Sequence, residues 1–384
     1  MRDGRERDSL MEQLEPTVGF EGRSDMKHLI VRCIRDRDWR CRVGSTLALA
    51  LLIGVIIYGR IVRSGAPTPA RLVVYAYSTQ EEVLTQSIFP AFEEAWEAAT
   101  GEDLTIEGVF GPSGTLAGQI NLGAPAQVAL FSNVQHVTHL KIGRRVRLET
   151  EPVVVSHTPM VIVVRQGNPA GIAEYADLAQ PGLQVLHADP RSSGAGEWAL
   201  LAEYGSAIQE SGDRAAALRL RSGQAEAQLQ AIWRNVRLLG ASARATMTLF
   251  ELGAGDAFVT YEQDALLAQE RGVPLEIVVP SRTIVARHVA VIVDGNVLSG
   301  EVPMAQAFVE YLLSDAGQQI LSRYHLRPAD LEGEEFTGIP QPFTVDDLGG
   351  WSRIYGEVVE RLWQAQIAPR LELDPAPGLL DRGG

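Results

Sequence analysis

Short apolar runs alternate with amphipathic stretches along most of the chain. Runs such as LVVYAY (72–77), LTIEGVF (104–110) and PMVIVVR (159–165) have the length and composition of buried strands. The stretch 83–100 repeats its apolar residues at helical spacing and ends at a glycine. Strands separated by helical stretches predict an α/β protein with largely parallel sheets. Further strands are expected at 126–131, 183–188, 235–240, 256–261, 275–280 and 287–294.

Helical patterns continue toward the C-terminus. A helix is expected from about Trp198, and the Ala/Arg/Gln-rich segment 214–230 is interpreted as a helical insertion on the surface. The apolar spacing over 305–324 predicts one long amphipathic helix. Residues 366–384 are interpreted as a loose tail.

An apolar segment precedes this body. Residues 43–59 contain no charged side chain, and basic residues outnumber acidic ones just before them. This asymmetry predicts a transmembrane helix, with residues 1–42 in the cytoplasm and the body outside. Residues 60–70 then form a linker. Because no small-residue cleavage site follows closely, we interpret the segment as an uncleaved anchor, with a cleaved signal segment as the alternative. Either Met1 or Met26 is the start of translation.

Charge and motif content exclude several classes of protein. A net charge of −14 leaves little to pair with phosphates, so nucleic acid is not expected as a partner. Both cysteines, Cys33 and Cys41, precede the body, which excludes a disulfide framework or a catalytic thiol there. No G-x-S-x-G or H-E-x-x-H motif occurs. His136 and His139 lack further ligands nearby, and we interpret them as solvated helix surface. We therefore expect no enzyme activity, no cofactor and no metal.

Four predicted strands end in small polar residues that are followed by a helical stretch. Hydroxyls and the unpaired N–H groups of a helix N-terminus donate hydrogen bonds, and glycine lets the backbone approach a ligand. One such turn is often only a helix cap, but four at the carboxyl ends of parallel strands favour a shared site. Such a site suits a desolvated oxyanion held by neutral donors. The turns are Ser78-Thr79, Ser113-Gly114-Thr115, Ser192-Ser193-Gly194 and Ser242-Ala243.

These residues lie in motifs that occur together in one known family. GPSGTLAGQ, VVRQGNPAGIAEYADLAQPG, DPRSSGAGEW, ASARATMT and FTVDDLGGW follow one another within residues 71–365. With this set and order the chain resembles the periplasmic sulfate/thiosulfate-binding proteins that serve ABC importers. The resemblance implies a type II periplasmic-binding fold over 71–365, in which two α/β lobes joined by two crossover segments close over a dehydrated tetrahedral anion.

The resemblance also implies where the lobes begin and end. The crossovers fall near 156–160 and 283–288. Lobe I then comprises about 71–157 and 286–345, and lobe II about 158–285.

Position by position, the resemblance further implies a set of ligand donors. Tyr261 stands where the family has a tryptophan whose indole N–H donates, and its hydroxyl can still donate. Ala195 replaces a family glycine, and Ser78 replaces an aspartate. Arg244 is given a supporting role, in which it braces a donor turn. The expected donors are the hydroxyls of Ser113 and Ser192 and the N–H groups of Ser113, Ser193, Gly194 and Ala243, with Gly114, Ser78, Thr79 and Tyr261 beside them.

A site built only of donors selects a fully ionised anion, because a protonated oxygen would face no acceptor. This favours sulfate over phosphate near neutral pH, provided that neither Glu81 nor Glu82 enters the cleft. We therefore expect a monomeric, extracytoplasmic protein, anchored in the membrane, that hands sulfate or thiosulfate to an ABC permease. Binding of molybdate, tungstate or another oxyanion stays open, as does a role as a membrane-anchored anion sensor.

Overall fold

The computed structural model describes residues 69–210, 221–330, 336 and 338–373. All of them belong to one compact unit, Thr68–Gly384. The predicted membrane segment 43–59, and nearly all of its flanking segments 1–42 and 60–70, lie outside the described residues. Within the described ranges, no helix has the length and apolar character needed to span a bilayer.

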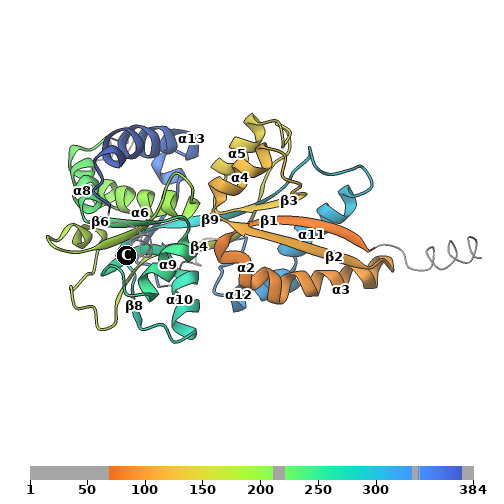
Figure 1. The fold of residues 1–384 in the computed structure, drawn as a ribbon, viewed down its shortest axis with the longest axis horizontal. Helices are drawn as coiled ribbons and strands as arrows, with labels where there is room; N and C mark the ends of the chain where they lie inside the picture. Colours follow the sequence, from red (N-terminus) through yellow and green to blue (C-terminus); the bar gives the residue numbers. More distant parts are fainter. Residues whose placement is uncertain (1–68, 211–220, 331–335, 337, 374–384) are drawn as a thin grey trace, which may run out of the picture. The chain divides into compact units, whose positions relative to one another are not determined.

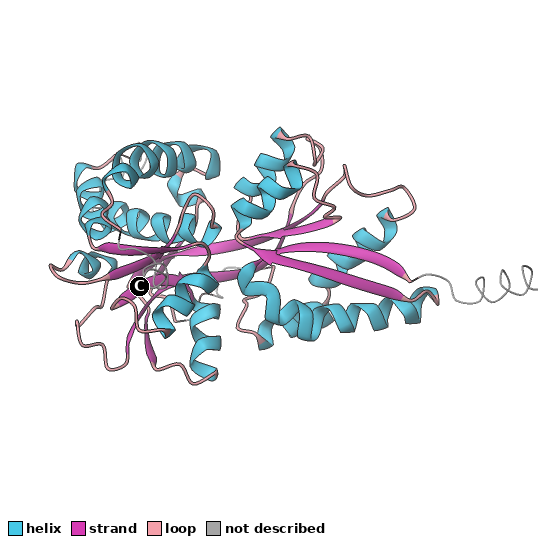
Figure 2. Cartoon of the chain, viewed as in Figure 1, coloured by secondary structure: helices cyan, strands magenta, loops and turns pink. Residues whose placement is uncertain are grey.

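Ten strands of the described chain form a continuous sheet (Figures 1 and 2). The main path runs β2-β1-β3-β9-β4-β7-β5-β6, with β10 beside β9 and β8 beside β4. The strands are β1 Ala70–Tyr77, β2 Leu104–Gly111, β3 Val128–Phe131, β4 Val153–Arg165, β5 Val185–Ala188, β6 Val236–Gly240, β7 Ala257–Tyr261, β8 Leu275–Val278, β9 Arg282–Ile292 and β10 Gln341–Phe343.

Helices cover both faces of this sheet (Figure 2). The α-helices are α2 Glu81–Val83, α3 Phe89–Thr100, α4 Ser113–Asn121, α5 Gln135–Ile142, α6 Gly194–Glu210, α8 Gly223–Arg234, α9 Ala243–Glu251, α10 Glu262–Glu270, α11 Val302–Leu313, α12 Asp315–Arg323 and α13 Trp351–Ile354. The 3₁₀ or π segments are η1 Ser78–Gln80, η2 Leu84–Ile88, η3 Tyr175–Ala179, η4 Asp346–Leu348, η5 Tyr355–Ile367 and η6 Ala368–Arg370.

Two long strands divide the sheet into two lobes. In one lobe β1 is parallel to β2 and β3, and in the other β5 is parallel to β6 and β7. β4 and β9 pair antiparallel between the lobes, from Ser156 opposite His288 to Pro159 opposite Val285. Beyond this stretch β4 pairs with β7, and β9 pairs with β3. The exact lobe limits stay a prediction.

Each lobe packs its own hydrophobic core against its part of the sheet. Phe89 and Phe308 pack on one face of β1, and Phe131 on the other. In the second lobe, Trp198 and Trp233 are fully buried in a large cluster. Because both faces are covered, the strands carry nearly continuous apolar runs, which is why their sequences were recognisable.

Three helical predictions differ from the structure. α8 buries Leu229 and Trp233 and exposes Gln224, so the described part of the predicted surface insertion is an amphipathic helix with one face in the core. The single helix expected over 305–324 breaks at Ser314, whose hydroxyl accepts the N–H of Gly317 and starts α12. η5 runs to Ile367, which is buried, so the predicted tail begins later than residue 366.

Candidate functional site

A small cavity lies where the two lobes meet, at the carboxyl ends of the strands. Its volume is about 10 Å³, roughly the space of a single water molecule. None of its lining side chains is charged. They are Tyr77, Ser78, Thr79, Gly111, Pro112, Ser113, Ser132, Ser193, Gly194, Ala195, Ala243 and Tyr261.

Helix N-termini from both lobes supply most of this lining. Ser113 begins α4 after β2, and Ser78 begins η1 after β1. Gly194 begins α6 and Ala243 begins α9 in the other lobe. The first N–H groups of a helix have no partner inside the helix, and the helix dipole is positive there. All four predicted turns therefore contribute residues to one cavity.

Hydroxyl groups complete the donor set. The Ser113 and Ser132 hydroxyl oxygens lie 3.1 Å apart, and the N–H of Ser132 donates to Ser113 Oγ over 3.2 Å. Ser132 follows β3 and is not among the donors predicted from the sequence. It obeys the same rule as the other turns, since a small polar residue ends a buried strand.

Three buried hydroxyls in the lining have no hydrogen-bond partner among the described residues, namely those of Tyr77, Thr79 and Tyr261. Burial raises the pKa of Tyr261 well above its usual value near 10, so the phenol stays protonated and able to donate. A buried hydroxyl without a partner costs roughly 1–3 kcal/mol. A bound acceptor would remove this cost.

Gly114 and Ser192 lie beside the cavity and not in its lining. The Gly114 N–H donates to the Ser192 carbonyl oxygen over 2.9 Å, and the Ser192 hydroxyl donates to the Ala241 carbonyl oxygen over 3.0 Å. The Ser192 hydroxyl, which was predicted as a ligand donor, and the Gly114 N–H are thus both occupied within the protein. The neighbouring Ser193 lines the cavity, although its N–H donates to Asp189.

The N-terminus of α9 contains a residue that lines the cavity, a residue that caps the helix and a charged residue. Ala243 lines the cavity, and the Ser242 hydroxyl caps the helix by accepting the N–H of Ala245. Arg244 does not line the cavity but lies near Asp264, which is buried and has no hydrogen-bond partner among the described residues. Burial raises the pKa of Asp264 to about 6, while Arg244 acts in the opposite direction.

Polar contacts hold the lobes together around the cavity. The Trp198 indole N–H donates to the Ser132 carbonyl oxygen over 2.7 Å. Asn133 Nδ2 donates to Glu197 Oε2 over 2.7 Å. Gly194 packs directly on Ser132 and Asn133 of the other lobe. The sequence contains no local signal for these pairings, because the partners are distant along the chain.

The interpretation of His136 as solvated surface was wrong. Only 2% of His136 is exposed, and its Nδ1 lies 2.9 Å from Asn133 Oδ1. The face of α5 that carries His136 is covered by α6 of the other lobe, which periodicity within α5 does not reveal. In the described part of the chain, no group of three or more His, Cys, Asp or Glu side chains is placed to hold a metal ion.

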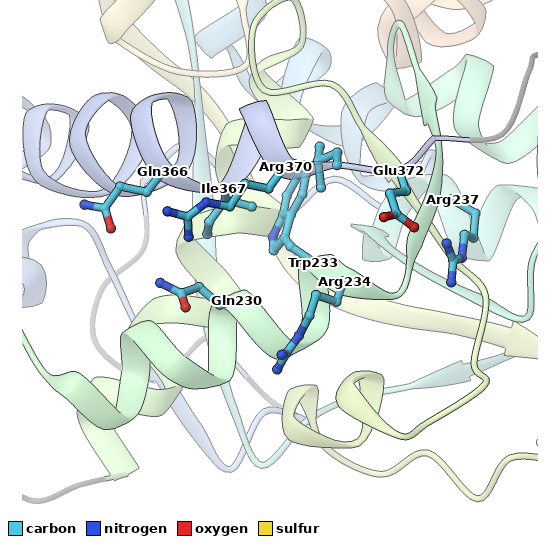
Figure 3. Close-up of a pocket in the computed structure, with 9 residues that line it drawn as sticks. Gln230, Trp233, Arg234, Arg237, Gln366, Ile367, Arg370 and Glu372 are labelled. Atoms are coloured by element: carbon cyan, nitrogen blue, oxygen red, sulfur yellow. The ribbon is translucent and has the colours of Figure 1, made fainter.

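A larger cavity, with a volume of about 400 Å³, lies between α8 and the C-terminal helical segment (Figure 3). Its lining includes Arg234, Arg237 and Arg370, together with Glu372. The three guanidinium groups point in different directions in Figure 3 and do not converge on one point. The small cavity between the lobes is therefore the better candidate site.

Comparison with known proteins agrees with this geometry. The family model of bacterial extracellular solute-binding proteins matches residues 72–327. The chain belongs to this family. The resemblance to sulfate/thiosulfate-binding proteins, stated from the motifs, is confirmed.

Curated members of the family carry more specific names. The sulfate-binding protein of Escherichia coli is 33% identical over 285 residues, covering 70% of this chain and 83% of that protein. The thiosulfate-binding protein of Pseudomonas aeruginosa is 30% identical over 254 residues, covering 63% and 74%. The solved structure of the sulfate-binding protein SubI from Mycobacterium tuberculosis matches with a TM-score of 0.66 at 23% identity, over 75% of this chain and 99% of that chain. This last likeness confirms the two-lobed α/β fold.

Proposed function

We propose that this protein binds sulfate or thiosulfate between its lobes and delivers it to an ABC permease. The observation that carries the proposal is the cavity between the lobes, whose lining combines helix N-termini with buried hydroxyls and lacks any charged side chain. Neutral donors of this kind suit a desolvated oxyanion. The names of the curated relatives point to the same two ligands.

The absence of a carboxylate from the lining supports a fully ionised ligand. Glu81 is exposed, and Glu82 pairs with Arg271 over 3.2 Å. A phosphate near neutral pH retains a proton, and its O–H group would find no carboxylate acceptor in this cavity. Sulfate and thiosulfate carry no such proton.

Location and partners follow from the family and the apolar segment. An extracellular solute-binding protein works outside the cytoplasm, where it captures its ligand for a permease. The segment 43–59 would hold the protein at the membrane, and we propose that it acts as a monomer. The permease would recognise the form in which the lobes have closed over the anion.

Calorimetric titration of the full-length protein with sulfate, thiosulfate, molybdate and phosphate at pH 7 tests the ligand. We expect one site per chain for sulfate or thiosulfate and at least hundredfold weaker binding of phosphate. Equal binding of phosphate and sulfate would contradict the donor-only site. Binding of molybdate alone would keep the site and change the ligand.

The same titration on serine variants tests the donors. Ser113→Ala together with Ser193→Ala removes two hydroxyls, each worth roughly 1.5–3 kcal/mol to a charged acceptor, so sulfate should bind at least a hundredfold more weakly. Ser192→Ala is the matched control, because its hydroxyl donates to Ala241, and its Kd should stay within threefold. The reverse outcome would show that Ser192 is the donor, as the motif position implied.

A further inference from the structure

A buried polar cluster lies between the lobes, behind the anion cavity. Glu197 comes from the first turn of α6 in one lobe, and Asn133 and His136 come from the β3–α5 region of the other. Their exposed fractions are 0–2%. Glu197 Oε2 accepts a hydrogen bond from Asn133 Nδ2 over 2.7 Å and lies 3.9 Å from His136 Nε2. The cluster therefore forms only while the lobes are together.

Hydrogen bonds within the cluster define where its protons are. The N–H of Gln135 donates to Asn133 Oδ1 over 3.0 Å, which fixes the amide so that Nδ2 faces Glu197. Asn133 Oδ1 then accepts from His136 Nδ1, 2.9 Å away, so Nδ1 carries the hydrogen. In a neutral imidazole the lone pair of Nε2 consequently faces the Glu197 carboxyl. This lone pair and an ionised Glu197 carboxylate repel each other. An additional proton on either group removes the repulsion.

The groups around the carboxyl do not offer a compensating positive charge. Among the described residues, His136 is the one basic group within 4 Å of it. Tyr261 at the end of β7 and Tyr355 of η5 face it as neutral phenols. At the edge of the cluster, His139 of α5 disfavours a positive charge on His136. Glu360 of η5 in turn favours a positive charge on His139. An ionised Glu197 would thus be a buried, unpaired negative charge beside a bound anion.

We propose that Glu197 and its partners take up one proton when the lobes close, so that this protein binds its anion together with a proton. The inference rests on the proposed function, because it requires the lobes to open and close around an anion. In an open form Asn133 and His136 would move away with their lobe, and Glu197 would meet water. There a carboxyl is ionised at neutral pH. Closure at the same pH then requires a proton.

The direction of the pH effect follows from the difference between the two forms. Burial raises the pKa of Glu197 to about 8 in the closed form, opposed by the hydrogen bond from Asn133, and burial lowers the pKa of His136 to about 3. A solvated glutamate titrates near 4.3. Since the closed form holds the extra proton, anion affinity should fall about tenfold per pH unit between the pKa of Glu197 in the open form, near 4.3, and its pKa in the closed form, about 8. Above the higher pKa the affinity should level off.

Titration calorimetry with sulfate at pH 7, in Tris and in bis-Tris, counts the protons taken up. The two buffers differ in ionisation enthalpy, and neither carries an oxyanion that would compete. The full-length wild-type protein should take up close to one proton per sulfate, and its Kd should rise about tenfold from pH 6 to pH 7. Glu197→Gln should take up almost no proton and show a nearly constant Kd.

Glu203→Gln is the matched control. Glu203 lies on the same helix, is equally buried, and contacts His187 over 3.2 Å and the Trp233 indole over 2.9 Å. All these partners belong to one lobe, so Glu203→Gln should leave proton uptake as in the wild type.

Three results would overturn the inference. Sulfate binding without proton uptake in the wild type would refute it and leave the proposed function intact. Equal uptake in Glu197→Gln and the wild type would show that another group takes the proton. No binding of any anion would overturn both proposals. If Glu197→Gln fails to fold, the proton count and the pH slope of the wild type still decide the matter.

Discussion

At the scale of single residues, Gly194 sets how closely the two lobes approach. A Cβ atom at this position would lie 1.8 Å from Ser132 Oγ and 3.0 Å from Asn133 Nδ2. Both atoms belong to the other lobe, so Gly194→Ala should hold the lobes apart. We expect the calorimetric Kd for sulfate to rise at least tenfold, while the fold of each lobe is kept.

Gly118, in the middle of α4, provides the comparison for this change. A Cβ there would meet no atom within 4 Å. Gly118→Ala should therefore keep the Kd and raise the free energy of unfolding by about 0.5–1 kcal/mol, as usual inside a helix. Identical Kd values in both variants would contradict the role given to Gly194.

At the scale of elements, the N-terminus of α9 must be held in place for Ala243 to line the cavity. The Ser242 hydroxyl accepts the N–H of Ala245 over 3.1 Å. Ser242→Ala should lower the free energy of unfolding by about 1 kcal/mol and raise the Kd for sulfate severalfold, because the first turn of α9 loosens. Denaturant unfolding and calorimetry measure the two effects.

A second helix cap separates loss of stability from loss of binding. Ser314 caps α12 in the same way, by accepting the N–H of Gly317 over 3.2 Å, and it is not part of the cavity. Ser314→Ala should cost a similar free energy of unfolding and leave the Kd unchanged. A parallel rise of the Kd in both variants would mean that overall stability governs binding.

At the scale of the whole molecule, the anion should stabilise the closed arrangement of the lobes. Ion pairs join them at the rim, Arg271 to Glu82 over 3.2 Å and His325 to Glu270 over 2.7 Å. These pairs are partly exposed and are worth little alone. Sulfate at a thousand times its Kd should add about 4 kcal/mol to the free energy of unfolding, measured by chemical denaturation at pH 7. Phosphate at the same concentration, binding at least a hundredfold more weakly, should add at most about 1.4 kcal/mol, and an equal effect of both anions would contradict the proposed selectivity.

The sequence by itself was sufficient for most of the fold and for the type of site. Strands buried on both faces are continuous apolar runs, and helices begin at capping residues, so both signals are local. The turns that contain Ser113, Ser193 and Ala243 were recognisable because small polar residues end buried strands. The family motifs then indicated a two-lobed anion-binding protein.

Only the tertiary structure decided how the lobes meet. β4 starts at Val153, whereas the apolar run predicted a strand only from residue 159. The run is interrupted by the polar residues Ser156 and His157, which the structure buries by pairing them with β9. Ser193 lines the cavity in place of Ser192, since adjacent residues in a turn point in different directions. His136 and Glu197 are buried by each other's lobe. Such contacts join distant parts of the chain, and no local pattern encodes them.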